Sequence, residues 1–188
     1  MALLLNNLKT YFWKRALLRD SVFILRNKCV INLGKANIIS IVYDASEEHD
    51  HHKVINFARK LQVEGKTIRA LGYVKYRHIP HYCNPTLSWD FFTIKEINWF
   101  NRPDSIHIRD FLKIEPDILI YLDQNNNPAL QYIAGLSRAK FKVGPYSEKY
   151  KENFDLMIDI NSKIPIDELI EYLVKYLKMI NKEANVFE

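Results

Sequence analysis

The chain has 188 residues, of which 48% are hydrophobic and 13% aromatic, with a formal net charge of +5. This length and composition suffice for one well-buried core and leave little room for a second, so we expect one main domain. The positive charge is concentrated in residues 1–36, which hold seven Lys or Arg and one Asp, whereas the rest of the chain is close to neutral.

The cysteines and the first residues bear on the compartment. Cys29 and Cys83 lie far apart, and neither belongs to a C-x-x-C pair. The opening run Ala2–Leu5 is soon interrupted by Asn6, which makes it too short for a signal peptide or a membrane span. These features predict a reducing, cytoplasmic location.

The N-terminal arm is expected to be helical. Leu3–Asn27 contains no Pro or Gly and is rich in helix formers, which predicts one or two helices. At 100° per residue, Arg15, Arg19 and Arg26 fall within roughly 40° of one another and would form a basic stripe. Asn32–Asn37 has the composition of a linker.

The first strand–helix–strand unit follows the arm. Ile38–Tyr43 predicts a strand, and Ser46 is a suitable N-cap for a helix over Glu47–Val63. Gly65 would end this helix. Thr67–Val74 predicts the next strand, which completes a βαβ pattern.

The middle of the chain is less regular. Residues 75–88 contain two prolines and predict an irregular loop. After this loop we expect a short strand, an aromatic surface turn and a short helix, at Asp90–Ile94, Asn98–Pro103 and Ile106–Lys113.

Pro116–Tyr146 predicts the centre of the sheet. Asp117–Leu122 is a nearly continuous apolar run, as expected for a strand covered on both faces. Pro128 suits the first turn of the following helix, because its missing N–H would have no partner there. Phe141 begins the next extended segment, so this unit is a second βαβ pattern with a right-handed crossover.

The C-terminal part predicts one more strand and one more helix. Ser147–Asn153 reads as a charged loop and Phe154–Ile160 as a strand. From Pro165 onwards the apolar residues recur with a 3.6-residue period up to Ile180. The predicted fold is a Rossmann-like three-layer α/β domain with a mostly parallel sheet over residues 37–188, preceded by a basic helical arm over residues 1–36.

The carboxyl ends of the predicted strands form the candidate pocket, because ligands of doubly wound sheets bind there. Asp44, Asp123, Gly144 and Tyr146 all fall at such ends. The two acidic residues could bind hydroxyl groups, hold a hard cation or act as a base, or they could only cap turns and helices.

The sequence lacks the usual signatures of nucleotide enzymes. It contains neither G-x-G-x-x-G nor G-x-x-x-x-G-K-S/T, and the loop Asp44–Glu48 has two glutamates where a phosphate would need glycine. Ser137 does not lie in a G-x-S-x-G elbow. We therefore assign no catalytic residue and expect no cofactor.

Two groups of histidines contain residue types that can bind a metal ion. His49, His51 and His52 are interpreted as a solvated first helical turn, and His78 with His81 and Cys83 as loop residues. Neither group shows a complete ligand set, so no metal site is predicted.

Six segments carry a resemblance to known sequences: Ala70–Val74, Asn98–Phe100, Pro116–Ile120, Leu130–Ile133, Leu136–Gly144 and Asp155–Ile160. They resemble a bacterial family of unknown function. More distantly, the progression from strand through helix to Ala139–Gly144 is similar to the acceptor-side half of heptosyltransferase-type glycosyltransferases. The chain lacks a second, donor-binding half, so no catalytic residue is transferred from that resemblance.

The leading functional prediction is a non-catalytic protein that binds RNA or the ribosome through its basic arm. The residues expected to contact RNA are Lys9, Lys14, Arg15, Arg19, Arg26 and Lys28. The alternative is a small enzyme or sugar-nucleotide-binding protein that uses the strand-end pocket. A membrane surface could also accept the arm, and Trp99 could anchor a protein partner.

Overall fold

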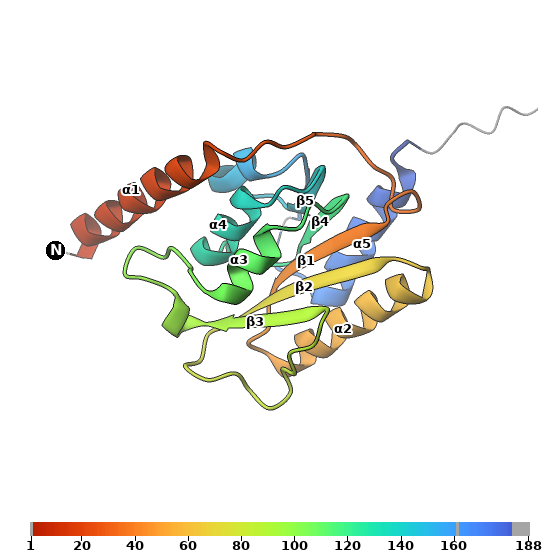
Figure 1. Ribbon diagram of the computed structural model, residues 1–188, viewed down its shortest axis with the longest axis horizontal. Helices are drawn as coiled ribbons and strands as arrows, with labels where there is room; N and C mark the ends of the chain where they lie inside the picture. Colours follow the sequence, from red (N-terminus) through yellow and green to blue (C-terminus); the bar gives the residue numbers. More distant parts are fainter. Residues whose placement is uncertain (1, 161, 182–188) are drawn as a thin grey trace, which may run out of the picture.

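The computed structural model describes residues 2–160 and 162–181. Within these residues, six strands form one parallel sheet in the order β3-β2-β1-β4-β5-β6. The strands are β1 (Ile38–Asp44), β2 (Thr67–Val74), β3 (Trp89–Thr93), β4 (Ile118–Tyr121), β5 (Phe141–Pro145) and β6 (Leu156–Ile158). This arrangement confirms the predicted Rossmann-like α/β class with an N-terminal helix (Figure 1). The predicted arm over residues 1–36 includes residue 1, and the predicted domain over residues 37–188 includes residues 161 and 182–188. These residues lie outside the described ones.

Helices cover both faces of the sheet, which explains the nearly continuous apolar sequence of its central strands. On one face, α2 (Glu48–Val63) and α5 (Ile166–Met179) pack over side chains such as Ile41 of β1. On the other face, α3 (Ile106–Leu112) and α4 (Pro128–Leu136) pack over the alternate side chains of the same strands. The result is the expected three-layer domain.

The N-terminal helix α1 (Ala2–Ser21) packs outside α4, as a further layer over one side of the domain (Figure 1). Trp13 is its main anchor: the indole is buried between the rings of Tyr132 and Tyr150, and its Nε1 donates to the Pro128 carbonyl at 3.0 Å. The close approach of α1 is made at Gly135, where an added Cβ would lie 2.9 Å from a methyl group of α1.

After α1 the chain crosses from the α4 side of the domain to the α5 side. The segment predicted as a linker is part of the main core, because Leu33 and Ala36 are buried there. Asn32 holds the end of α5: its Nδ2 donates to the carbonyls of Lys178 and Ile180 at 3.0 and 2.7 Å. We call residues 22–37 the strap, because they connect the packing of both faces of the sheet.

Three local predictions differ from the structure. Ser46 is not the N-cap of α2, because the cap position is Glu47 and the Ser46 hydroxyl accepts the Lys75 N–H instead. The predicted charged loop after β5 contains a 3-10 helix, η2 (Glu148–Asn153), whose Tyr150 packs under α1. The other 3-10 helix, η1 (Ile94–Glu96), follows β3, and the last strand is only three residues long.

A buried lysine lies inside the domain. The side chain of Lys142, on β5, is almost fully buried, and its Nζ donates to the carbonyls of Ala134 and Gly135 at 2.7 and 3.1 Å. These carbonyls belong to the last turn of α4, which favours a cation. Burial nevertheless lowers the pKa of Lys142 to about 7, and the nearby positive charge of Arg26 acts in the same direction.

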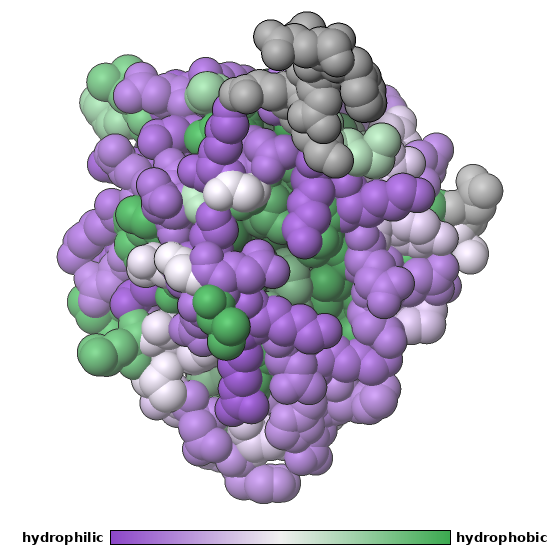
Figure 2. All heavy atoms as spheres, turned by 90° about the vertical axis from the view of Figure 1, so that its right-hand side faces the viewer, coloured by the Kyte–Doolittle hydropathy of each residue, from purple (hydrophilic) through white to green (hydrophobic). Residues whose placement is uncertain are grey.

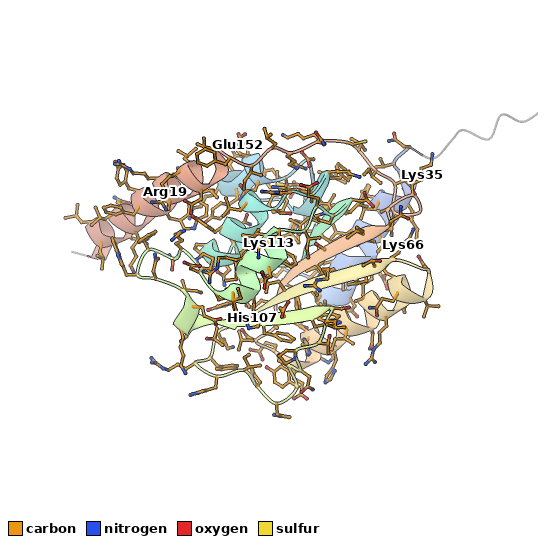
Figure 3. All side chains as sticks on the ribbon, in the orientation of Figure 1. Arg19, Lys35, Lys66, His107, Lys113 and Glu152 are labelled. Carbon is orange, nitrogen blue, oxygen red and sulfur yellow. The ribbon has the colours of Figure 1, made fainter. Side chains whose placement is uncertain are left out.

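The strands begin at one side of the domain and end at the opposite side. The edge where strands begin faces the viewer in Figure 2, and its surface is mostly hydrophilic with hydrophobic side chains visible in a hollow. Lys35 and Lys66 precede β1 and β2 and are labelled on this side of the molecule in Figure 3. The strands end at the opposite edge, where the candidate pocket lies.

Candidate functional site: a pocket at the centre of the strand ends

The pocket lies where the strand order changes direction. β1 and β4 are neighbours in the middle of the sheet, but the chain leaves β1 towards β2 and leaves β4 towards β5. The loops after the two strands therefore diverge and leave a crevice between them, which is the usual ligand position in open α/β sheets.

A cavity of about 250 Å³ occupies this crevice, which we call the switch-point pocket. Its walls come from the loop after β1 with the first turn of α2, from the loop after β4, and from the segment before α5. The lining residues are Asp44, Glu47, Asp50, Leu122, Asp123, Gln124, Asn125, Lys163, Ile164, Pro165 and Ile166.

Asp44 ends β1 and is half-buried in the pocket wall. Its Oδ1 accepts the Ser46 N–H at 2.9 Å, so the carboxylate also shapes the turn into α2. Burial raises the pKa of Asp44, the hydrogen bonds from Ser46 oppose this, and the negative charge of Asp123 adds to the increase. The charged form of Asp44 is therefore disfavoured when the pocket holds no cation.

Asp123 follows β4 and is fully buried. Its Oδ2 accepts the Tyr121 hydroxyl at 2.9 Å and the Asn127 N–H at 2.7 Å, while Oδ1 accepts the Asn125 N–H at 2.9 Å. Asn127 in turn caps α4 by accepting the Ala129 N–H at 2.9 Å. Asp123 thus fixes the loop that forms the second wall.

The third wall is held by side-chain hydrogen bonds across the pocket. The amide of Gln124 pairs with the backbone of Ile164, donating to its carbonyl at 2.8 Å and accepting its N–H at 3.0 Å. Lys163 Nζ donates to the side-chain oxygen of Asn125. The wall is therefore positioned even without a ligand.

The charge of the lining is predominantly negative. Glu47 is neutralised in part by an ion pair with Lys75. Among the described lining residues, Asp44, Asp50 and Asp123 are then opposed by one cation, Lys163. Such a pocket repels phosphate groups and attracts cations.

The predicted pocket residues are brought together only in part. Asp44 and Asp123 line the same cavity, and Tyr146 meets Asp123 in an adjoining cavity of about 170 Å³. Gly144 lines neither, because it packs inside the sheet, where an added Cβ would lie 3.1 Å from Tyr121. Lys163 was not predicted, since nothing in the sequence connects it with the end of β1.

The histidine cluster at the start of α2 is not simply solvated, so the interpretation was wrong for His51. Its ring is buried, with Nδ1 2.8 Å from the Tyr43 hydroxyl and Nε2 3.2 Å from the Tyr82 carbonyl. Burial lowers the pKa of His51, which favours a neutral ring that accepts from Tyr43 and donates to Tyr82.

The other histidine group, His78 and His81 with Cys83, lies in the loop between β2 and β3. Cys83 is buried, which raises the pKa of its thiol to about 12, and His78 contacts Lys95. Among the residues that the structure describes, no three His, Cys, Asp or Glu side chains are placed to hold a metal ion.

The predicted RNA-contacting residues differ in their exposure and in the groups that they contact. Arg26 is not on α1, which ends at Ser21, so the predicted basic stripe is wrong for this residue. It donates to the carbonyls of Ala139 and Lys140 and pairs with Asp155, with side chains that are 11% and 17% exposed.

The other arm cations are more accessible. Lys28 lies 3.9 Å from the same Asp155 carboxylate, and Arg19 pairs with Asp20 at 2.8 Å. Arg15 donates to the Tyr11 hydroxyl at 3.4 Å, while Lys14 is exposed and Lys9 partly exposed. Arg19 and Lys35 lie at opposite ends of the molecule in Figure 3, so the positive charge of the arm does not form one patch.

Asp20 is the acidic centre of the arm. It accepts hydrogen bonds from Arg19, Arg102 and the Tyr132 hydroxyl. Burial alone would raise its pKa, but the hydrogen bonds and the two positive charges outweigh burial and lower it. This cluster joins the end of α1 to α4 and to the loop after η1.

In the described part of the chain, none of the helices combines the length and the apolar composition that crossing a bilayer requires.

Comparison with known proteins identifies the family of the chain but not its function. No curated protein matches the chain. The model of the family of unknown function DUF6913 matches residues 9–180. Since this match covers nearly all of the sequence, the chain belongs to the DUF6913 family.

Proposed function

We propose that the protein binds a small organic cation, such as an alkylamine or a guanidinium compound, in the switch-point pocket. The observation that carries this proposal is the half-buried carboxylate of Asp44, which lines the cavity together with the buried Asp123. Burial and the negative charge of Asp123 raise the pKa of Asp44, and a bound cation would offset the cost of keeping Asp44 ionised.

The size and the walls of the pocket restrict the ligand. A cavity of about 250 Å³ is smaller than most pockets for drug-sized molecules, so it suits a ligand of metabolite size. Lys163 on the third wall would repel a second positive charge. We therefore expect one cationic end at Asp44 and a polar, uncharged part near Asn125.

A sugar nucleotide is the second candidate, from the resemblance to glycosyltransferases. The loop after β1 contains Glu47 and Glu48 and no glycine, and the pocket lining is negative. Both features oppose a pyrophosphate. Binding of a sugar nucleotide therefore stays a prediction, which the nucleotides in the thermal-shift panel test.

The test is a thermal-shift panel on the full chain with ethanolamine, 4-amino-1-butanol and N-acetylputrescine, each with one cationic end and a polar, uncharged part, alongside nucleotides and sugar nucleotides. A ligand at 100 times its Kd would stabilise the protein by roughly 2.7 kcal/mol. We expect a shift with at least one amine, reduced when the pH is lowered into the range where Asp44 takes up its proton. If no amine changes the melting temperature, or if nucleotides alone do, the proposal is refuted.

Asp44→Asn separates binding from folding. The charged form of Asp44 is disfavoured in the free protein, so the variant should be at least as stable as the wild type. It should nevertheless lose the ligand-induced shift. Glu171→Gln, the same chemical change at an exposed position on α5, should keep the shift.

Binding of RNA through the arm stays a prediction. It is supported by the concentration of positive charge in residues 1–36 and by the exposure of Lys14 and Arg15. The measurement is co-sedimentation with ribosomes over a salt series, in which retention should fall steeply with salt and in a variant with Lys14 and Arg15 changed to Gln.

A further inference from the structure

The outward side of α1 carries an exposed apolar surface. Trp13, Ala16 and Asp20 face the domain, whereas the residues on the opposite side face away from it. Leu4 is 75% exposed and Trp99, in the loop after η1, is 53% exposed. We call this surface the arm patch; it consists of Leu4, Leu5, Leu8, Tyr11, Phe12 and Trp99.

The aromatic part of the arm patch is continuous. Phe12 packs against Trp99 and Tyr11 with ring centroids 5.3 and 5.5 Å apart, and Trp99 packs against Phe100 at 5.3 Å. The leucines continue the patch towards the start of α1, which projects beyond the rest of the molecule in Figure 1. A helix with apolar residues on both its inner and its outer side is normally covered on both.

The charged side chains of α1 before Asp20 are all positive. Lys9, Lys14, Arg15 and Arg19 lie on α1, and the helix has no acidic residue before Asp20, which points into the hydrogen-bonded cluster with Arg102. Two copies of this face would bring these cations together with no carboxylate between them, which opposes self-association. The charge pattern therefore favours an anionic partner.

We propose that the arm patch docks the protein on an anionic lipid surface, with α1 lying parallel to the membrane plane between the headgroups and the domain. Leucines and aromatic rings can enter the boundary between headgroups and acyl chains, while the long Lys and Arg side chains beside them reach the anionic headgroups. Binding of RNA would involve the cations of α1, but it would not explain the exposed leucines on the same side of the helix. Among the described residues no helix spans a bilayer, so the attachment is peripheral.

The test is flotation of the full chain with vesicles of phosphatidylcholine alone and of phosphatidylcholine with 30% phosphatidylserine. We expect binding to the anionic vesicles that decreases with salt. Each basic residue near the surface is worth about fivefold in affinity, so Arg15→Gln should weaken binding by about that factor. Lys175→Gln, an exposed change on α5, should have no effect.

Two apolar substitutions test the leucines. Leu5→Ser together with Leu8→Ser removes exposed side chains without touching the core, so the variant should stay folded and lose most vesicle binding. Leu87→Ser is the matched control, because Leu87 is 91% exposed in the loop before β3. Binding should also shift the tryptophan emission to shorter wavelength in the wild type but much less in Trp99→Phe.

Three results would overturn this proposal. The first is equal binding to neutral and anionic vesicles, or none to either. The second is a concentration-dependent dimer without lipid that the leucine variant abolishes, because a second copy would then cover the patch. The third is co-sedimentation with ribosomes that depends on Arg15 but is unchanged by the leucine variant, because the arm would then be an RNA-binding surface.

Discussion

Replacing Lys142 with Met should change how the stability of the protein depends on pH. The Lys142 amine has a pKa of about 7 in the folded protein, against an ordinary value of 10.5. Between these values the unfolded chain binds a proton that the folded protein does not, so the free energy of unfolding rises with pH in this window. Below pH 7 both states are protonated, and the whole cost of the buried charge is present.

The magnitude follows from the two pKa values. Stability changes by about 1.4 kcal/mol per pH unit inside the window, which amounts to about 3 kcal/mol between pH 6 and pH 9. Lys142→Met removes this titration. The difference in unfolding free energy between the wild type and the variant should therefore shift by about 3 kcal/mol in favour of the wild type over this range.

Urea denaturation at pH 6, 7, 8 and 9 measures this difference, and the other titrating groups cancel in it. Lys175→Met is the control, because Lys175 is exposed on α5, and its difference from the wild type should stay constant. If the difference for Lys142→Met is also constant from pH 6 to 9, the amine is not titrating in the folded protein as argued here.

Three further changes address the attachment of the arm. Trp13→Ala removes a buried ring and its hydrogen bond and should cost about 3–5 kcal/mol in urea denaturation, whereas the exposed Leu18→Ala should cost little. Gly135→Ala places a Cβ against α1 and should speed limited proteolysis of the arm, despite the higher helix propensity of alanine. A double-mutant cycle of Arg26→Gln and Asp155→Asn should give a coupling energy of about 1–3 kcal/mol, and additive effects would mean that this pair does not hold the strap.

The sequence predicted the sheet well because burial on both faces leaves a local signal. The apolar runs of β1 and β4 and the 3.6-residue stripe of α5 are visible without any tertiary information. The positions of Asp44 and Asp123 followed from the rule that ligands bind beyond the carboxyl ends of parallel strands.

Features that depend on distant segments could not be predicted. His51 is buried because the loop with Tyr82 folds over it, and Lys163 reaches the pocket only through the packing of α5. Lys142 had a weak signal, as a charged residue in the middle of a strand pattern. Its partners are helix carbonyls, which no sequence pattern identifies.

The strap has a consequence for synthesis of the protein. Leu33 N–H donates to the Leu177 carbonyl at 3.1 Å, and Asn32 donates to the carbonyls of Lys178 and Ile180. The face of the sheet that α2 and α5 cover is therefore completed only after the ribosome has made α5. Until then nascent chains expose the α5-facing surface of the sheet, so a premature stop before Ile166 should give insoluble protein instead of a shorter folded domain.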